Sequence, residues 1–296
     1  MLSRMEKSLA REAGVSQAEL ARLPPPAELL RRAEGPAELL PRPPPRPLHR
    51  QHTLLVIARQ HSGYPVLGQF LTTETGWWET GEPAPFSLPA TSDLLSCVLT
   101  PGLVAAFPAS LSPGSSFPTA CLLAAGADCS DPLSYEQLCW SRPRLVLRTR
   151  HTSLASARAL LAAHPGLAVV YLARDPRGAV QEAARAAQLC SELAADLTAA
   201  ASLAQEFPGR FTLSRYEELA VRPRQAVTQL LAGLGLGQDT VAGGREDSDW
   251  SAESNPVSRV DRWRGRLTSK QLQLVETSCL EPLSRLEYQL LGRGVA

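Results

Sequence analysis

Arginine and small polar residues follow a buried strand at two places in the chain, and both could bind an anion. At the later of the two places along the chain, Arg174 directly follows the apolar run LAVVYLA. Asp175 is placed to cap a helix, and Pro176 suits the first helical position. Arg177 follows on the first turn. Helix N-termini present unpaired N–H groups, and arginine binds phosphate through paired hydrogen bonds. The pattern predicts a phosphate site; an ion pair of Arg177 with a carboxylate is the alternative.

The other place is a strand–turn–helix junction in TLLVIARQHSGYPVLGQFL, residues 53–71. The strand ends at Arg59, Ser62 and Gly63 form a turn, and Pro65 can occupy the first position of the next helix. Backbone N–H groups in such a junction can form a nest for a phosphate. The lysine of the GxxxxGK(S/T) phosphate loop is missing, so an ordinary turn is the alternative to a nucleotide site.

Short apolar runs alternate with amphipathic patterns from His52 onward, which is typical of parallel α/β folds. We expect buried strands at residues 53–59, 144–149, 167–174 and 210–216. We expect helices at residues 153–163, 176–206, 223–234 and 269–291. In an open parallel sheet, ligands bind beyond the carboxyl ends of the strands, which is where both junctions are expected.

The composition is typical of one globular domain with a tail. The chain has 296 residues, 44% of them hydrophobic, and a formal net charge of +1. This charge gives no general attraction for nucleic acid, so anion binding must be local. Residues 1–50 contain clusters of proline and are interpreted as a flexible tail, with an SH3-type ligand as the alternative. Residues 51–296 are expected to form the folded domain.

The cysteines show no metal-binding spacing. None of the six forms a CxxC pair, so we expect no metal site. Cys121, Cys129 and Cys139 crowd one loop-like segment, which suits a loop held by a disulfide in an oxidising lumen. Reduced cysteines that pack as small hydrophobic residues are the alternative. The sequence also has no run of 18 apolar residues and no signal-peptide pattern at its start.

Several segments resemble, in the same order, the carbohydrate sulfotransferases that act on the 6-hydroxyl of Gal, GalNAc or GlcNAc. VVYLARDPRGAV resembles their segment for the 3′-phosphate of the donor nucleotide, and SGYPVLGQFL resembles their 5′-phosphosulfate loop. The likeness covers about residues 52–292. It also includes GEP at 81–83, the spacing of Cys121, Cys129 and Cys139, RYEELAVRP at 215–223, NPVSRVDRWRGRL at 255–267, Cys279 and LEY at 286–288.

The resemblance implies a P-loop-like three-layer α/β fold, with a central, mostly parallel sheet flanked by helices. It also implies transfer of a sulfuryl group from 3′-phosphoadenosine 5′-phosphosulfate (PAPS) to a glycan hydroxyl, without a metal. The acceptors would be keratan sulfate, chondroitin or GlcNAc-terminated chains in the Golgi lumen. Membrane contact would require an N-terminal anchor, which the sequence does not show.

Roles follow from the same resemblance. The backbone of residues 61–66 would cradle the 5′-phosphosulfate, Arg174 would bind the 3′-phosphate, and Arg264 beside Trp263 would close over the nucleotide. Glu82 would accept the hydroxyl proton, although a turn-capping carboxylate is the alternative, and His61 is the second catalytic candidate. The candidate nucleotide-binding residues are Arg59, His61, Ser62, Gly63, Tyr64, Pro65, Val66, Arg174, Asp175, Pro176, Arg177, Glu182 and Arg264.

Three departures from the family pattern weaken the nucleotide site. Tyr64 and Pro65 replace two serines of the loop, and His61 replaces an arginine. Glu182 stands where the family has a serine that binds the 3′-phosphate. A carboxylate facing that phosphate would cost about 4 kcal/mol per unit charge at about 4 Å, unless Glu182 turns away or pairs with Arg185. The alternative function is therefore a non-catalytic descendant that binds a glycan or a partner protein.

Overall fold

The computed structural model describes residues 52–59, 61–74, 77–79, 88–100, 103, 136, 139–150, 152–236 and 257–291. The chain divides into two compact units. The first unit comprises Met1–Gln51 and Trp78–Leu147, and the second comprises His52–Trp77 and Arg148–Ala296. The expected tail at residues 1–50 lies outside the described residues, and so does Glu82.

Three parallel strands form the core of the second unit. They are β1 (His52–Ala58), β4 (Leu167–Ala173) and β5 (Phe211–Arg215), with β4 paired to both of the others. All seven residues of β4 are buried, which explains why its sequence is continuously apolar rather than alternating. In β1 every residue after His52 is buried as well.

The first unit contributes a second parallel pair. Its described strands are β2 (Trp78–Glu79) and β3 (Arg144–Thr149), the latter ending in the second unit, and its described residues include helix α5 (Leu88–Leu95). In the second unit the strand order is β1-β4-β5. The predicted α/β fold with a parallel sheet is therefore confirmed, and all four predicted strands are present.

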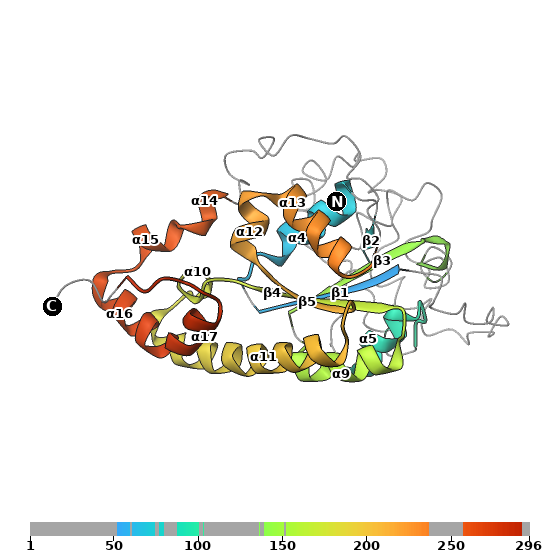
Figure 1. Cartoon of the computed structure of the whole chain (residues 1–296), viewed down its shortest axis with the longest axis horizontal. Coiled ribbons are helices and arrows are strands. Elements are labelled where there is room, and N and C mark those ends of the chain that lie inside the picture. Colours follow the sequence, from blue (N-terminus) through green and yellow to red (C-terminus); the bar gives the residue numbers. More distant parts are fainter. Residues whose placement is uncertain are drawn as a thin grey trace, which may run out of the picture. The chain divides into compact units, whose positions relative to one another are not determined.

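Helices cover both faces of the three strands in the second unit (Figure 1). In that view α9 and α11 run below the strands, and α4, α12 and α13 lie above them. The Ser153 hydroxyl caps α9 by accepting a hydrogen bond from the Ser156 amide. The bounds are α4 (Tyr64–Glu74), α9 (Leu154–Ala163), α11 (Ala186–Glu206), α12 (Tyr216–Val221) and α13 (Pro223–Gly233).

The long helix expected at residues 176–206 is interrupted, so that prediction was wrong. The chain forms α10 (Pro176–Ala179), a 3₁₀ turn (Ala183–Arg185) and then α11, with Val180 in an extended conformation. The Arg266 guanidinium donates hydrogen bonds to the carbonyls of Arg177 and Val180. Because a distant side chain satisfies these carbonyls, α10 can end after a single turn.

The single helix expected at residues 269–291 is also divided. The structure has α16 (Ser269–Ser278) and α17 (Leu280–Arg285), followed by a non-helical segment at residues 286–291. Pro282 has no N–H to bond the carbonyl of Ser278, and its ring excludes that carbonyl, so the helix breaks at Cys279. Two shorter helices, α14 (Val257–Val260) and α15 (Arg262–Arg266), precede this pair.

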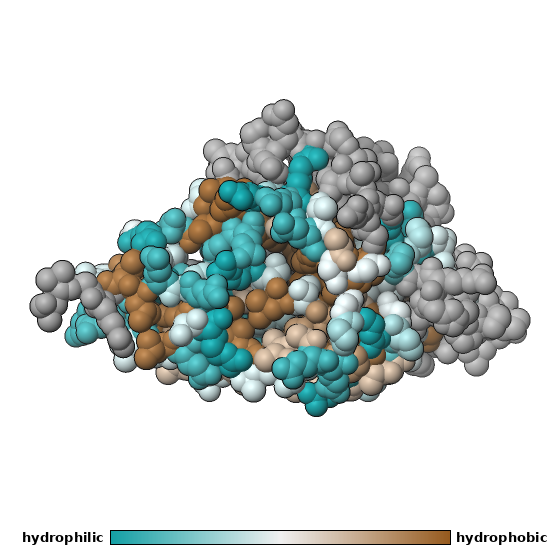
Figure 2. Space-filling view, in the orientation of Figure 1, coloured by the Kyte–Doolittle hydropathy of each residue, from teal (hydrophilic) through white to brown (hydrophobic). Residues whose placement is uncertain are grey.

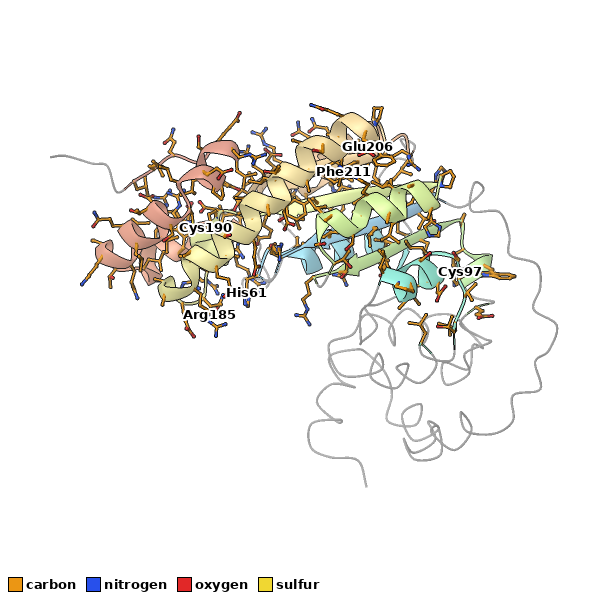
Figure 3. The ribbon with its side chains drawn as sticks, turned by 90° about the horizontal axis from the view of Figure 1, so that it is seen from below. His61, Cys97, Arg185, Cys190, Glu206 and Phe211 are labelled. Atoms are coloured by element: carbon orange, nitrogen blue, oxygen red, sulfur yellow. A yellow bond between two sulfur atoms is a disulfide. The ribbon has the colours of Figure 1, made fainter. Side chains whose placement is uncertain are left out.

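Two disulfides occur among the described cysteines. Cys97 pairs with Cys139 in the first unit, and Cys190 on α11 pairs with Cys279 in the second. Figure 3 labels Cys97 and Cys190 at these positions. The second disulfide lies in a buried cluster with Val180, Ala186, Val275 and Leu283. Cys121 and Cys129 lie outside the described residues.

The outer face of the C-terminal helices keeps some apolar surface. Leu274 on α16 and Leu280 on α17 are 49% and 44% exposed. Figure 2 shows hydrophobic residues at the surface over these two helices. No helix within the described ranges combines the length and the apolar character that crossing a membrane requires.

Candidate functional site

An arginine-lined cavity of about 540 Å³ lies in the second unit, at the carboxyl ends of the strands. His61 follows β1, Arg150 follows β3 and Arg174 follows β4, and all three line it. Among the described residues the lining contains five arginines and no carboxylate. The lining residues are His61, Gly63, Arg150, Arg174, Gly178, Gln181, Arg259, Arg262, Trp263 and Arg266. Such a lining suits a ligand that carries several negative charges.

The turn after β1 depends on Gly63. His61 and Gly63 both have positive φ angles, 62° and 78°. The Val66 amide donates to the Gly63 carbonyl at 3.0 Å, which leads the chain into α4 at Tyr64. A Cβ atom on Gly63 would lie 2.2 Å from the ring of Tyr216, a distance that real contacts do not reach. The predicted turn at residues 62–63 is confirmed, and it faces the cavity.

The junction after β4 has the predicted cap. Pro176 is in the first turn of α10, and an Asp175 carboxylate oxygen accepts from the Arg177 amide at 2.9 Å. Both residues are buried. They shape the turn rather than line the cavity, whereas Arg174, immediately before them, is one of the lining residues.

Arg174 connects three segments around the cavity. Its Nη1 donates to the His61 carbonyl at 2.8 Å, and its Nη2 donates to the Arg259 carbonyl at 2.7 Å. The guanidinium lies 4.4 Å from the centroid of the Tyr216 ring. Its Nε is buried and has no hydrogen-bond partner among the described residues. Arg174 therefore braces the wall of the cavity in this structure.

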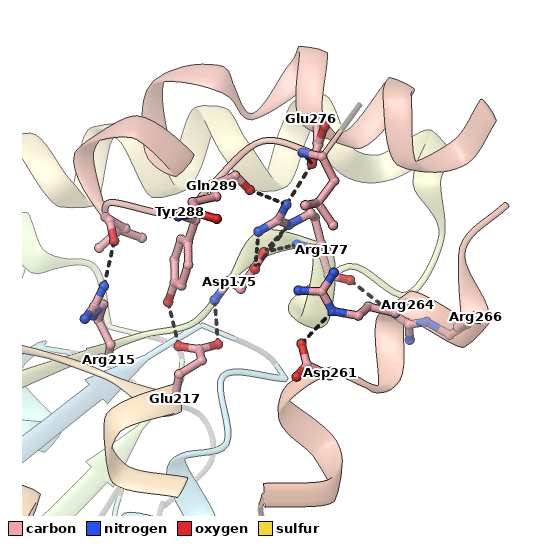
Figure 4. A network of polar contacts seen from close by, with 12 residues as sticks. Asp175, Arg177, Arg215, Glu217, Asp261, Arg264, Arg266, Glu276, Tyr288 and Gln289 are labelled. Carbon is pink, nitrogen blue, oxygen red and sulfur yellow. Dashed lines mark hydrogen bonds and ion pairs between the residues drawn. The ribbon is translucent and has the colours of Figure 1, made fainter. Parts of the chain in front are cut away.

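Arg177 is a structural residue in this geometry. Its Nη2 lies 2.7 Å from Asp175 Oδ2 and its Nη1 lies 2.7 Å from Glu276 Oε1 (Figure 4). Its side chain is only 4% exposed and stacks on the ring of Trp263 at 4.4 Å. Of the two alternatives drawn from the sequence, the structure contains the ion pair. Arg177 is not among the described residues that line the cavity.

His61 is poised to be neutral. Partial burial lowers the pKa of its imidazole, and the positive charges of Arg174, Arg150 and Arg266 lower it further. A neutral imidazole can accept a proton or donate a hydrogen bond. The position of His61 on the cavity wall is thus compatible with either catalytic or binding duty.

Two predicted arginines are committed elsewhere. Arg59 pairs with Asp196 at 2.6 Å and Glu192 at 2.9 Å, both on α11. Arg264 pairs with Asp261 at 2.8 Å and lies 4.6 Å from the Trp263 ring centroid. Neither is among the described lining residues. The backbone of Tyr64 and Pro65 begins α4, and Ser62 and Val66 are buried beside the turn.

Glu182 turns toward solvent. Its side chain is 72% exposed, and its Oε2 lies 3.8 Å from the Arg185 Nε. The extended conformation at residues 180 and 182 brings Gln181, rather than Glu182, to the cavity. Glu182 therefore turns away and pairs with Arg185, so its carboxylate does not face the cavity.

Several lining residues were missed from the sequence. Arg150 follows β3 directly, as Arg174 follows β4, so the rule that found Arg174 could have found it. Arg259, Arg262 and Arg266 come from α14 and α15, where only Arg264 was selected. The dense arginine spacing in SRVDRWRGR was the available signal.

No protein-family model matches the chain, and no curated protein matches its sequence. Among solved structures, the chain is similar to the sulfotransferase domain of the Synechococcus PCC 7002 olefin synthase, with 18% identity, a TM-score of 0.45, and 82% of this chain and 97% of that one covered. It is also similar to the sulfotransferase domain from the curacin biosynthetic pathway, with 14% identity, a TM-score of 0.45, and 81% and 99% covered.

A third similar structure is the mouse sulfotransferase SULT7A1 complexed with PAP, with 12% identity, a TM-score of 0.44, and 80% of this chain and 87% of that one covered. The TM-scores of all three lie below 0.5 and the identities are low. The function proposed next therefore rests on the cavity and on the ordered sequence motifs.

Proposed function

We propose that the protein transfers a sulfuryl group from PAPS to a hydroxyl of a carbohydrate. The observation that carries this proposal is the cavity itself, whose described lining holds five arginines without a carboxylate. A nucleotide with a 3′-phosphate and a 5′-phosphosulfate carries charge at two separated points. The lining arginines likewise come from separate segments, which include the end of β3, the end of β4 and the helices α14 and α15.

The turn at residues 61–63 would receive the 5′-phosphosulfate, as its motif implies. It precedes α4, an eleven-residue helix whose N-terminal end carries the partial positive charge of the helix dipole. Arg174 Nε–H and the exposed guanidinium groups of Arg150 and Arg262 would supply hydrogen bonds and positive charge. These groups would bind the donor before any chemistry occurs.

In the proposed reaction the acceptor hydroxyl oxygen forms a bond to sulfur while the bond from sulfur to the bridging phosphate oxygen breaks. The electron pair of the broken bond stays on the departing 3′,5′-bisphosphate, where arginine charge stabilises it. The hydroxyl proton passes to a base, for which His61 and Glu82 are the candidates. The 6-hydroxyl of Gal, GalNAc or GlcNAc, a glycan acceptor and a Golgi location belong to the same proposal through the family resemblance. The disulfides favour an oxidising compartment.

Calorimetric titration with adenosine 3′,5′-bisphosphate tests the site. The double variant Arg150→Gln/Arg262→Gln removes two charges from the cavity, and we expect its Kd to rise by about ten- to a hundredfold. Arg158→Gln is the matched control, because Arg158 is an exposed arginine on α9 that pairs with Glu206 and does not line the cavity. We expect that control to bind like the natural chain.

Absence of binding by the natural, folded chain would overturn the proposal, and so would equal losses in the cavity variant and the control. Transfer of labelled sulfate from PAPS to keratan or to GlcNAc-terminated chains then tests the reaction. Nucleotide binding without transfer to any acceptor would contradict the catalytic part and point to a non-catalytic descendant.

A further inference from the structure

A non-helical segment at residues 286–291 lies against the junction between β4 and α10 (Figure 4). Arg177 Nη1 donates to the Gln289 carbonyl at 2.8 Å, and the Leu291 amide donates to Glu276 Oε1 at 2.9 Å. At the other end of the segment, Arg215 Nη1 donates to the Leu286 carbonyl at 3.0 Å. The segment is thus held by side chains from three different helices or strands.

Glu217, in the first turn of α12, connects this segment to the junction. Its Oε1 accepts from the Asp175 amide at 3.1 Å, and its Oε2 accepts from the Tyr288 hydroxyl at 2.5 Å. Burial raises the pKa of Glu217, while these two hydrogen bonds act in the opposite direction. Burial and the charge of Glu217 raise the pKa of Tyr288 well above its usual value, so its hydroxyl remains a donor.

The two groups of contacts converge on Asp175. Its amide is held by Glu217 and its carboxylate is held by Arg177. Asp175 directly follows Arg174, whose guanidinium braces the cavity wall. Neither Glu217 nor Tyr288 is among the described residues lining the cavity, so neither would contact a ligand there directly.

We propose that Glu217 and Tyr288 are positioning residues, which fix the backbone at Asp175 and thereby hold Arg174 in place on the wall of the arginine-lined cavity. Both residues lie in motifs that carry the family resemblance, Glu217 in RYEEL and Tyr288 in LEY. The consequence for nucleotide affinity rests on the proposed function, whereas the consequence for the backbone of the junction does not.

Hydrogen exchange of the ligand-free protein tests the structural part. Tyr288→Phe keeps the aromatic ring and removes the hydroxyl. We expect amide exchange in residues 172–180 to accelerate by about tenfold, with the change centred on Asp175. Tyr171→Phe is the matched control, because Tyr171 is buried and also donates its hydroxyl to a carboxylate, Asp196, at 2.9 Å on α11. That control loses a comparable bond without touching Glu217.

Glu217→Gln provides a second variant, since its single amide oxygen can accept only one of the two donors well. We expect faster exchange at the junction in this variant too. Exchange at the junction that stays at the natural rate in both variants would overturn the proposal. Equal acceleration in Tyr171→Phe would also overturn it, because the effect would then be a general loss of stability.

The functional readout is the Kd for adenosine 3′,5′-bisphosphate, which we expect to rise about three- to tenfold in Tyr288→Phe and to stay unchanged in Tyr171→Phe. If the natural chain does not bind this nucleotide, the proposed function fails while the exchange data still decide the positioning role. If the nucleotide binds and Tyr288→Phe binds equally well despite faster exchange, the link to Arg174 is wrong.

Discussion

Gly63 is the residue whose replacement has the clearest steric consequence. Its φ angle of 78° disfavours any other residue, and the ring of Tyr216 occupies the space where a Cβ would go. Gly209 has a similar φ angle of 73°, but no atom of the described residues lies within 4 Å of its hypothetical Cβ. Replacing Gly209 should therefore cause backbone strain alone, whereas replacing Gly63 should cause backbone strain and a steric clash.

We predict that Gly63→Ala destabilises the protein by clearly more than Gly209→Ala. The latter should cost only about 1–2 kcal/mol, the usual penalty for the left-handed conformation. Urea denaturation of both variants measures the difference, and nucleotide titration should show loss of binding for Gly63→Ala alone. Equal unfolding free energies would mean that Tyr216 can move aside at little cost.

His61 gives the site a predictable response to pH. Its pKa is lowered in the folded chain, so near the usual value of about 6.5 the unfolded chain binds more protons at this position. The contribution of His61 to stability is therefore fully present above that value and is lost as the pH falls toward the folded pKa. A bound anion would favour the imidazolium and raise its pKa again.

We therefore predict that binding of adenosine 3′,5′-bisphosphate at about pH 6.5 takes up more protons in the natural chain than in His61→Gln. Calorimetry in two buffers with different ionisation enthalpies measures this uptake. The phosphates of the nucleotide can also take up protons. Because this uptake is common to both proteins, the difference between the natural chain and His61→Gln reports on His61. Identical uptake by both chains would show that His61 does not sense the ligand.

At the scale of elements, the Cys190–Cys279 disulfide joins α11 to the start of α17 across 89 residues of sequence. Both cysteines are fully buried, and neither lines the cavity. α16, which ends next to Cys279, carries Glu276, a partner of Arg177. The disulfide thus stabilises the helices that support the junction after β4.

We predict that Cys190→Ala/Cys279→Ala lowers the free energy of unfolding by about 2–4 kcal/mol. At temperatures where the variant remains folded, nucleotide affinity should change by less than about threefold, because the cavity arginines remain. Chemical denaturation and titration on the same samples give both values. An unchanged free energy of unfolding would mean that the Cys190–Cys279 disulfide does not stabilise the fold. A large loss of nucleotide affinity would mean that the disulfide affects the arginine-lined cavity directly.

The interruptions of the helices show which local rules are visible in a sequence. Pro282 indicates that a helix ends near α16, but the apolar periodicity continues across this proline and predicts one long helix. The end of α10 has no comparable signal. Arg266, whose guanidinium satisfies the carbonyls of Arg177 and Val180, lies 89 and 86 residues away in the sequence.

For the whole molecule, the sheet was predictable because each buried strand is a continuous apolar run that ends in arginine or polar residues. Predicted and observed strand ends agree within about one residue. The positions of Gly63, Asp175 and Pro176 followed from turn and capping chemistry, which is local. The ion pairs of Arg59 and Arg177 could not be predicted from local patterns, because their partners Asp196 and Glu276 lie 137 and 99 residues away.

The Arg177 contacts have a consequence for synthesis of the chain. Its carboxylate partner Glu276 and the Gln289 carbonyl follow it by 99 and 112 residues. A ribosome adding about 5–20 residues per second takes roughly 5–20 s to make that stretch. During this interval the Arg177 side chain, which is buried in the folded protein, can pair with Asp175 but not yet with Glu276. The junction after β4 therefore stays exposed to solvent during this interval. We expect proteases to cleave this junction in ribosome-bound chains that are stalled before Glu276 is added.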